Sequence, residues 1–485
     1  MSFETWTLED AEIRLIDGDR GKNYPKQADF NASGHCLFLS AKNVTSSGFQ
    51  FSDPVFIGKE RHDLLRAGTL ERGDIVMTTR GTIGNVAYYD SSVSYPLVRI
   101  NSGMMIFRAN QELWNTRFLY YVLTSPVIQD QITSLTSGSA VPQLPARDLK
   151  KFALPKVPLS VQNRIEAIIS SLSDKLSLNQ RINQTLEQMA QAIFKSWFVD
   201  FEPVKAKIAA LEAGDSEEDA LLAAMQAISG SSLCNADASA AGAQAALTRF
   251  QTEQPEQYAE LRATAELFPS AMQDSELGEI PEGWHQSTVG HEFDVTMGQS
   301  PPGDTYNEEG DGAPFFQGRR DFGERFPSNR VYCSAPKRMA NEGDTLLSVR
   351  APVGDTNIAL TNCCIGRGLA ALRHKSGCSS YTYYSIIQLG QALSSYDSEG
   401  TVFGSINQKN LRAIPVVAPA IDVLAAFTRT VGSIDELIRV NSEEASTLAD
   451  TRDTLLPKLL SGELSVPCNR DEIECELLST TPELE

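Results

Sequence analysis

Two arginines occupy the same place in two stretches of similar sequence. Arg80 lies in GDIVMTTRGTIGNVA and Arg350 lies in GDTLLSVRAPVGDTN, each after a strand-like run and shortly before a glycine. A guanidinium at such a loop tip can bind a phosphate, or can donate two parallel hydrogen bonds to O6 and N7 of guanine. The alternative is an ion pair with Asp74 or Asp344 that only holds the turn. The pattern leaves both interpretations open.

Further polar residues repeat around these arginines. FLSAKNV matches FFQGRRD after an aromatic run, and GSAVPQLPARDLKKF matches GTVFGSINQKNLRAI before the last long segment of each half. Basic and amide side chains at these places suit contacts with a nucleic-acid backbone or with base edges, but exposed strand ends and helix starts look the same. The candidate DNA-contacting residues are Lys42, Asn43, Arg80, Thr82, Gln143, Arg147, Arg319, Arg320, Arg350, Ser405 and Lys409.

The elements that must carry these residues are short β-branched and aromatic runs punctuated by Gly, Asn, Asp and Ser, which is typical of strands. One short helix is expected in each half, over 116–132 and over 381–393. Two loosely related copies of one module predict a pseudo-symmetric chain that recognises two similar targets. They argue against a solenoid or propeller, which would have many copies. The expected class is α+β.

Each module runs into a long segment with apolar residues every three or four positions, which begins after Pro158 or Pro419. This spacing predicts two coiled-coil helices, each roughly 60 Å long for about 40 residues. Ile168, Ile182 and Met189 also fall within the expected seam. The seam residues expected to pair the helices and dock partners are Ile165, Leu172, Asn179, Leu186, Ile193, Leu424, Val431, Asn441, Leu448 and Leu455.

One asparagine interrupts each seam. Asn179 lies seven residues before Leu186, and Asn441 lies seven residues before Leu448. Buried asparagines that face each other would set the register and orientation of the helices. A solvated asparagine on a helix flank is the alternative.

The formal charge of −20 is unevenly distributed. Residues 200–283 carry 16 acidic and 4 basic side chains, and residues 420–485 carry 14 acidic and 5 basic ones. The rest of the chain is close to neutral, so each module can still have a local basic face for nucleic acid. No apolar run is long enough to span a membrane, no secretory signal is visible, and the chain is expected to be cytoplasmic.

Motifs for covalent chemistry were sought and not found. The sequence has no G-x-x-x-x-G-K-[ST] phosphate loop, no H-E-x-x-H, no G-x-S-x-G and no Asn/Asp-Pro-Pro-aromatic motif. Its 8 cysteines form no C-x-x-C pair, and its 5 histidines supply no zinc-finger spacing. We therefore expect a chain that is not an enzyme and has no metal site or cofactor of its own.

Together these stretches resemble the specificity subunits of type I restriction–modification enzymes. The resemblance is carried by the GDIVMTTRGTIG strand and loop, by the long segment that begins PLSVQNRIEAIISSLSDKL, by LFPSAMQDSELGEIPEGW, and by SIDELIRVNSEEASTLADTRDTLLPKLLSGEL. It covers nearly the whole chain, in the order module, helix, acidic connector, module, helix. The family has no fixed base-contact motif, so the candidate DNA residues above come from local chemistry and repetition alone.

The resemblance implies a non-catalytic subunit that recognises a bipartite target in double-stranded DNA. It implies two β-rich target-recognition domains, each followed by a long helix, with the helices paired as an antiparallel coiled coil that spaces the half-sites. Methyltransferase (modification) subunits and restriction/translocase subunits would dock on this chain and carry S-adenosylmethionine, ATP and Mg. The expected segments are 1–157 and 284–419 for target recognition, 158–199 and 420–465 for the long helices, 200–283 for an acidic helical connector, and 466–485 for an acidic tail.

Two other functions remain open at this point. The chain could be the recognition subunit of another two-chain restriction–modification enzyme, in which one partner both cuts and methylates. It could also be a coiled-coil scaffold with two β-rich modules that bind protein or glycan. Steep salt dependence of DNA binding would argue against the scaffold, because phosphate contacts release counterions.

Overall fold

A computed structural model gives the fold of residues 3–45, 47–136, 143–229, 240–390, 392–393 and 404–466, and side chains are described for most of these. The predicted acidic tail lies almost entirely outside the described residues. The chain divides into two compact units, residues 1–178 with 444–485 and residues 179–443, so each unit contains one β-rich region and part of both long helices. Each unit is described by itself below.

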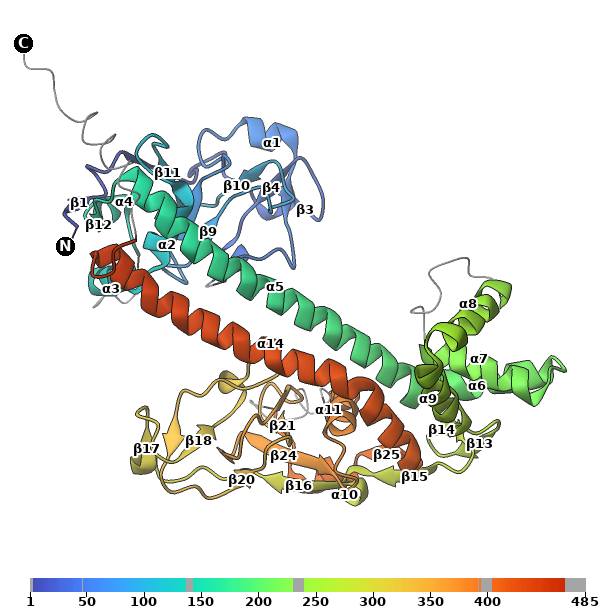
Figure 1. Ribbon diagram of the computed structural model, residues 1–485. Helices are drawn as coiled ribbons and strands as arrows, with labels where there is room; N and C mark the ends of the chain where they lie inside the picture. Colours follow the sequence, from blue (N-terminus) through green and yellow to red (C-terminus); the bar gives the residue numbers. More distant parts are fainter. Residues whose placement is uncertain are drawn as a thin grey trace, which may run out of the picture. The chain divides into compact units, whose positions relative to one another are not determined.

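The first unit holds a β-rich region followed by the start of the long helix α5 (Leu159–Phe198) (Figure 1). Its sheets have the strand orders β2-β11-β8-β9, β10-β4-β7-β3, β5-β6 and β1-β12. Its short helices are α1 (Lys59–Asp63), α2 (Thr116–Thr124), α3 (Pro126–Thr136) and α4 (Ala146–Leu149). Its strands are β1 Thr5–Thr7, β2 Ile13–Asp17, β3 Phe30–Asn31, β4 Cys36–Phe38, β5 Val44–Thr45, β6 Gly48–Phe49, β7 Phe56–Ile57, β8 Ile75–Thr78, β9 Val86–Tyr88, β10 Val98–Arg99, β11 Met104–Ala109 and β12 Ala153–Pro155.

The second unit repeats this topology. Its sheets have the orders β16-β24-β21-β22, β17-β19-β18-β23-β20, β15-β25 and β13-β14. Its helices in the β-rich region are α10 (Val289–Glu292), α11 (Ser379–Gln388) and α13 (Gln408–Ala413), before the long helix α14 (Ile421–Ser461). Its strands are β13 Met272–Ser275, β14 Gly278–Pro281, β15 His285–Thr288, β16 Phe293–Met297, β17 Tyr306–Asn307, β18 Ala313–Phe316, β19 Tyr332–Cys333, β20 Met339–Ala340, β21 Thr345–Ser348, β22 Thr356–Ile358, β23 Cys363–Ile365, β24 Leu369–His374 and β25 Pro415–Ala418.

The correspondence extends to strand direction. The sheets β2-β11-β8-β9 and β16-β24-β21-β22 are antiparallel throughout. The sheet that contains β4 and the sheet that contains β18 each include one parallel pair, β4 with β10 and β18 with β23. In both units the first strand of the module pairs with the last one, β1 with β12 and β15 with β25, immediately before the long helix begins. The two ends of each module are thereby fixed at the helix entrance. The expected α+β class, with two β-rich regions each followed by a long helix, is confirmed.

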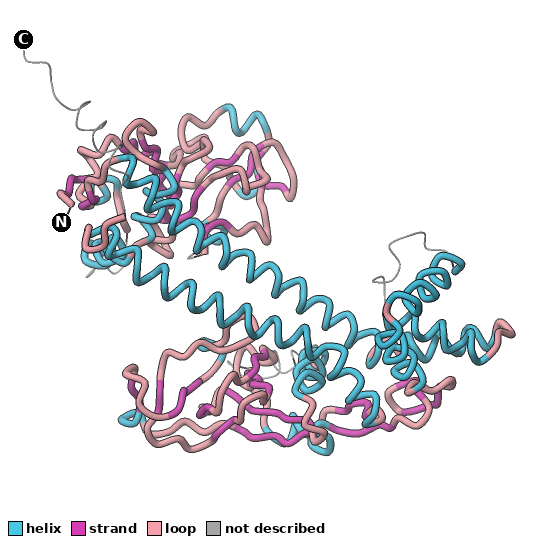
Figure 2. Tube along the Cα trace, viewed as in Figure 1, coloured by secondary structure: helices cyan, strands magenta, loops and turns pink. Residues whose placement is uncertain are grey.

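A helical connector separates α5 from the second β-rich region (Figure 2). It consists of α6 (Glu202–Glu212), α7 (Glu217–Ser229), α8 (Ala240–Glu253) and α9 (Pro255–Glu266). Leu221, Ala224 and Met225 are buried in the same core as Trp197. Lys207 is also buried and donates to the carbonyl oxygen of Phe268 at 2.5 Å, and this burial lowers the pKa of its ammonium group. The connector is therefore packed onto the end of α5.

The long helices pair antiparallel within each unit. In the second unit, Phe194 near the end of α5 contacts Phe427 near the start of α14, with ring centroids 5.8 Å apart. In the first unit, Ile165 and Ile169 share a buried core with Leu456, Leu459 and Leu460. The residues that face the partner helix in α5 recur at spacings of three and four, as a coiled-coil seam requires. They include the predicted positions Ile165, Leu172, Asn179, Leu186 and Ile193, and on α14 Leu424, Val431, Asn441, Leu448 and Leu455, all buried or half-buried.

Two details of the seam differ from the sequence prediction. Ile168, Ile182 and Met189 are exposed, because the inner face continues through Ile169, Asn183 and Ala190, each one residue further on. Asn441 is buried as predicted, but its amide donates to Oδ1 of Asn183 at 3.0 Å. Asn183 in turn donates to Oγ of Ser442 at 3.0 Å. Asn179 is buried as well.

Another difference concerns the helix expected over 116–132. The structure has two helices there, α2 and α3, and Ser125 between them has an extended backbone. The residue before a proline disfavours the helical conformation, so Pro126 ends the first helix and starts the second. Among the helices of the described ranges, none combines the length and apolarity needed to cross a membrane.

Candidate nucleic-acid interface

The arginine loops are built alike in the two units. Arg80 directly follows Thr79 at the end of β8 and forms an isolated β-bridge with Gln143, and Arg350 forms the same bridge with Ser405. All four side chains are exposed. The bridges continue inward, because Leu144 N donates to Thr79 O and Ile406 N donates to Val349 O, each at 3.0 Å. Residues that the sequence placed about 60 positions apart therefore lie side by side in both copies.

A hydroxyl group closes each arginine loop. Oγ1 of Thr78 accepts from the backbone N–H of Asn85 at 3.0 Å, and Oγ of Ser348 accepts from that of Asp355 at 3.2 Å. Gly84 and Gly354 have φ values of +88° and +110°, which other residues rarely adopt. The hydroxyls and the glycines thus explain the repeated [TS]-x-x-x-x-x-G spacing, Thr78 to Gly84 and Ser348 to Gly354, around each loop. Thr82 lies exposed at the tip of the first loop.

The structure rejects the ion pairs considered for these arginines. Asp74 is 2% exposed and accepts from Nε and Nη2 of Arg108 at 2.8 and 2.6 Å. Asp344 accepts from Nε of Arg373 at 2.5 Å. Both aspartates therefore hold the turn through arginines on β11 and β24, which the sequence analysis did not single out. Arg80 and Arg350 are left at the surface.

The second group of candidates lies on a 3₁₀ turn in each unit, Ala41–Asn43 and Arg319–Asp321. Asn43 is 5% exposed, accepts from the backbone N–H of Ser40 at 2.8 Å and donates to Gln50 O at 3.0 Å. Its side chain closes the turn, so this geometry gives no support to the DNA contact predicted for Asn43. Asp321 is 4% exposed and accepts from the N–H of Gln317 at 2.9 Å.

This turn geometry shifts the sequence match by one residue. Asn43 corresponds to Asp321, so Lys42 corresponds to Arg320, and Ala41 to Arg319. Lys42, Arg319 and Arg320 are all exposed. An exposed basic residue at the middle of the turn is therefore common to both units, whereas Arg319 is an addition of the second unit.

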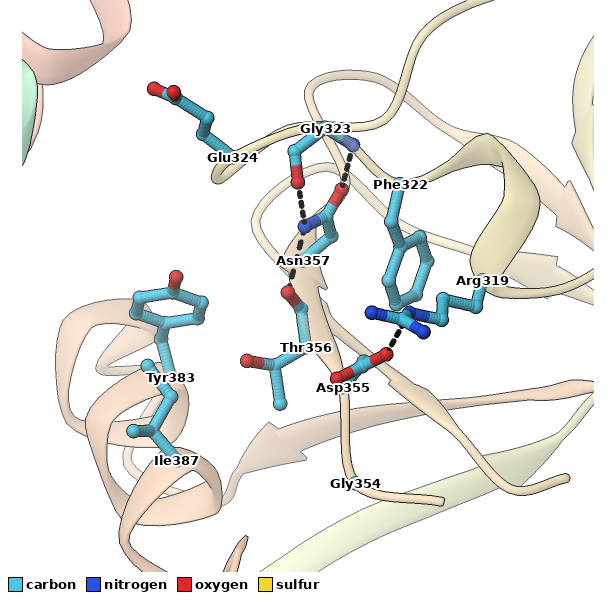
Figure 3. Close-up of a pocket in the computed structure, with 10 residues that line it drawn as sticks. All are labelled: Arg319, Phe322, Gly323, Glu324, Gly354, Asp355, Thr356, Asn357, Tyr383 and Ile387. Carbon is cyan, nitrogen blue, oxygen red and sulfur yellow. Dashed lines mark hydrogen bonds and ion pairs between the residues drawn. The ribbon is translucent and has the colours of Figure 1, made fainter. Parts of the chain in front are cut away.

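The 3₁₀ turn lies against the arginine loop in both units. In the first, the amide of Asn85 donates to Val44 O at 3.0 Å. In the second, Asp355, which holds the place of Asn85, forms an ion pair with Nε of Arg319 (Figure 3). These contacts place the basic turn beside the loop that carries Arg80 or Arg350.

The third group lies where a short helix follows the bridged segment. Arg147 on α4 has a side chain that is 83% exposed, with Asp148 3.6 Å from its Nε. Lys409 on α13 is exposed as well. Lys150, a further basic residue after α4, forms an ion pair with Glu9 at 2.8 Å. Within the described residues, Arg147 and Lys409 make no hydrogen bond or ion pair with the arginine loops.

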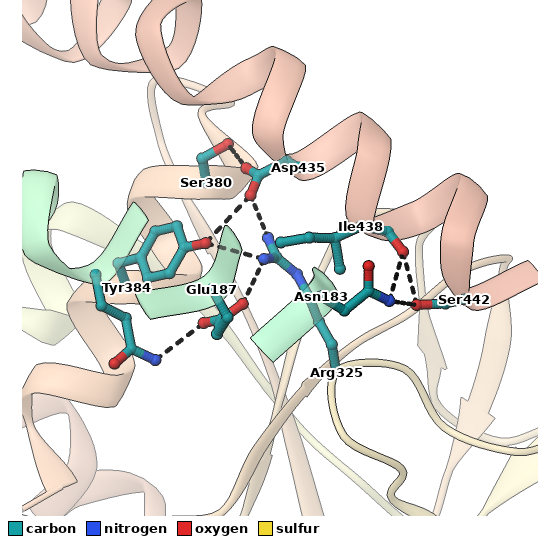
Figure 4. A network of polar contacts seen from close by, with 9 residues as sticks. Asn183, Glu187, Arg325, Ser380, Tyr384, Asp435, Ile438 and Ser442 are labelled. Atoms are coloured by element: carbon teal, nitrogen blue, oxygen red, sulfur yellow. Dashed lines mark hydrogen bonds and ion pairs between the residues drawn. The ribbon is translucent and has the colours of Figure 1, made fainter. Parts of the chain in front are cut away.

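The second β-rich region is fixed to the helix pair by one buried arginine that the sequence analysis missed. Arg325 is 5% exposed and donates to Glu187 of α5 at 2.6 Å, to Asp435 of α14 at 2.5 Å and to the hydroxyl of Tyr384 at 2.9 Å (Figure 4). Its guanidinium carbon lies 4.7 Å from the ring centre of Tyr383. Burial alone would lower the pKa of Arg325, but Asp435, Tyr384 and Glu187 raise it above its ordinary value.

In the first unit, the β-rich region is attached to α5 by an ion pair between α2 and α5. Asp174 lies sixteen residues after Pro158, as Asp435 lies sixteen after Pro419. Asp174 accepts from Nη2 of Arg117 on α2 at 2.9 Å, and Asp435 accepts from Ser380 at the equivalent place on α11. Each module is thus anchored by its internal helix to a carboxylate of the long helix that follows it.

The family model described as Type I restriction modification DNA specificity domain matches residues 11–188. The Type I restriction enzyme HindI specificity subunit of Haemophilus influenzae is 28% identical over 475 residues, which cover 92% of this chain and 98% of that protein. The putative type I restriction enzyme MjaX specificity subunit of Methanocaldococcus jannaschii is 36% identical over 195 residues, or 40% of this chain and 46% of that protein. A solved type I S subunit from M. genitalium is 14% identical, with a TM-score of 0.48 and coverage of 95% and 96%.

The two repeated modules, each followed by a long helix, and the sequence matches point to a class of DNA-recognition subunit. The chain is similar along most of its length to type I restriction–modification specificity subunits. It is the DNA-specificity component of such a system and is itself non-catalytic; the family carries no catalytic cofactor site. Within the described residues, no group of three or more His, Cys, Asp or Glu side chains is arranged to hold a metal ion.

The Arg325 cluster yields a stability prediction. Arg325→Met is expected to lower the free energy of unfolding by about 3–5 kcal/mol, because Glu187 and Asp435 would stay largely buried without their counterion. The matched control is Arg439→Met, which removes two exposed ion pairs from α14 and is expected to change stability by no more than about 0.5 kcal/mol. Urea unfolding of the intact chain measures both. Equal losses for the two variants would contradict the role given to Arg325.

Proposed function

We propose that the chain reads a bipartite sequence in double-stranded DNA, one half-site with each β-rich region. The observation that carries the proposal is the repetition of one surface in both units. Each unit presents an exposed arginine loop, a bridged polar residue, a basic 3₁₀ turn beside the loop, and a basic residue on the following short helix. Buried charges and glycines fix the backbone of that surface, and the candidate side chains on it, apart from Asn43, are exposed.

The proposed contacts follow from the chemistry of these side chains. Arg80 and Arg350 stand on braced loops and can donate in parallel to guanine or grip a phosphate. Gln143 and Ser405, bridged to them, can bond base edges or phosphate oxygens. The residues proposed to hold the DNA backbone are Lys42, Arg147, Arg320 and Lys409, and Thr82 is proposed to contact DNA beside Arg80.

We propose that methyltransferase subunits, and with them the restriction/translocase subunits, dock on the helix pair. In the second unit, Arg325 covers the flank of the pair that carries Glu187 and Asp435. The opposite flank exposes Ile182 (36%), Met189 (46%) and Leu437 (45%), with Val440 (45%) close to it in the heptad. Apolar side chains at helical spacing, left uncovered beside a buried seam, suit a partner helix.

The proposed partners supply what this chain lacks. S-adenosylmethionine would be bound by the modification subunits, and ATP and Mg by the restriction subunits. The assembly is proposed to work in the cytoplasm, where its DNA target lies.

The arginine loops yield a DNA-binding prediction. Arg80→Ala and Arg350→Ala are each expected to weaken discrimination at one half-site only, by about 5- to 150-fold if the guanidinium reads guanine. If either arginine holds a phosphate instead, affinity should fall for all sequences and the dependence of log K on log salt should lose about one unit of slope. Binding is measured with the complete methyltransferase complex on duplexes that vary one half-site at a time.

The control for both variants is Arg14→Ala, which removes an exposed arginine from β2 of the first unit. It should bind like the unaltered complex. If Arg80→Ala and Arg350→Ala also bind like the unaltered complex in both assays, the proposed DNA surface is wrong.

The exposed flank yields a docking prediction. Ile182→Asp with Met189→Asp should weaken binding of the methyltransferase subunit at least about tenfold, because two carboxylates would be desolvated in the interface. Leu64→Asp changes an exposed leucine (52%) outside the helix pair and serves as the control. Sedimentation of the chain with the methyltransferase subunit measures the affinities. Full binding by the double variant would place the docking surface elsewhere.

A further inference from the structure

We propose that Asp355 positions Arg319 to read a guanine in the half-site recognised by the second β-rich region. This inference rests on the proposed function and adds a specificity-determining pair to it. A carboxylate such as Asp355 repels the phosphates of DNA and is unexpected on a DNA-binding surface. Its proposed role is to orient the neighbouring guanidinium of Arg319.

The pair joins two rigid pieces of backbone. Asp355 closes the arginine loop, where its N–H donates to Oγ of Ser348 at 3.2 Å and its carbonyl accepts from the Ser348 N–H at 2.8 Å. Arg319 begins a 3₁₀ turn that the buried carboxylate of Asp321 closes, with Gln317 N–H at 2.9 Å and Arg330 Nη2 at 3.1 Å. Both side chains therefore leave the backbone in fixed directions.

The ion pair engages only one edge of the guanidinium. Oδ2 of Asp355 forms an ion pair with Nε of Arg319, and within the described residues the two terminal nitrogens of Arg319 make no hydrogen bond. A guanidinium held at Nε presents those two nitrogens as a fork, which is the arrangement that fits O6 and N7 of guanine. The side chains remain 60% and 39% exposed, so a base edge can approach.

Open space lies beside this ion pair. Arg319 and Asp355 border a cavity of about 360 Å³, and the ring of Phe322 lies next to Arg319 (Figure 3). Glu324 lines the same cavity, but Figure 3 shows its carboxylate away from the pair. Of the exposed arginines on this surface, Arg320 and Arg350 have no comparable carboxylate partner among the described residues.

The first unit provides an internal control. The places of Arg319 and Asp355 are held there by Ala41 and Asn85, and Asn85 donates its amide to Val44 O. A buttressed arginine is thus absent at this place in the first β-rich region. The inference consequently concerns one base pair in one half-site.

The test uses the full chain assembled with its methyltransferase subunits and a library of duplexes randomised at the target positions. Asp355→Asn keeps the shape but removes the charge that fixes Arg319, and Arg319→Lys keeps the charge but removes the fork. Both are expected to reduce the preference for guanine at the same single position by about fivefold or more. The affected position is expected to lie in one half-site, and preference in the other half-site should not change.

Glu324→Gln is the matched control, since it removes a carboxylate from the same cavity without touching the pair, and its methylation pattern should match that of the unaltered complex. A complex that keeps its full guanine preference with Asp355→Asn or Arg319→Lys would overturn the inference. So would a loss spread over both half-sites, which would indicate general damage. If the unaltered complex showed no sequence preference at all, the proposed function itself would fail.

Discussion

Two helices that are far apart in the sequence, α5 and α14, pack through residues spaced alternately three and four apart. This seam is the constraint on which the other features depend, because both modules are attached to it. Each module ends in a strand pair at the helix entrance and sends an internal helix, α2 or α11, onto a carboxylate of the long helix. The buried contact between Asn183 and Asn441 favours one register over its neighbours, at some cost in stability. A slip of the seam would move every one of these attachments.

The two modules differ in how firmly polar groups hold them. The second has a buried arginine that joins the loop at 325, both long helices and α11, and separating a buried charge from its partners is strongly destabilising. The first relies on the pair of Arg117 with Asp174 and on the contact of Tyr121 with Ser170 at 3.1 Å. The common surface of exposed candidates is therefore carried by two differently anchored copies.

Local features of this fold could be predicted from the sequence. Repeated glycines and hydroxyl residues around Arg80 and Arg350 encode the loop within a few residues, and the apolar period encodes the long helices. The prediction of Ile182 and Met189 in the seam was wrong. The residues one position further on, Asn183 and Ala190, fit the spacing of three and four nearly equally well, and they are the buried ones. The one-residue error that matched Lys42 with Arg319 arose because the letters were aligned without the turn that Asn43 and Asp321 close. The break between α2 and α3 could have been predicted from Pro126, because the residue before a proline rarely adopts the helical conformation.

Other features depend on contacts between distant parts of the chain. The partners of Arg325 lie at 187, 384 and 435, and those of Asp74 and Asp344 lie on strands about 30 residues away. No spacing rule connects such residues, so the sequence left Arg80 and Arg350 undecided between an ion pair and a free guanidinium. Which bases the exposed residues contact stays a prediction for the same reason.

We propose that the helix pair sets the distance between the half-sites. The most direct test of this proposal is to delete one heptad from each helix, residues 175–181 and 442–448, which lie opposite each other in the antiparallel pair and leave Asp174, Asn183 and Asn441 in place, and to map methylated sites with the assembled complex. Removing seven residues shortens a helix by about 10.5 Å, the length of roughly three base pairs. The account predicts that methylation at the original gap is lost and that the preferred gap becomes shorter. An unchanged preference for the original gap would contradict it.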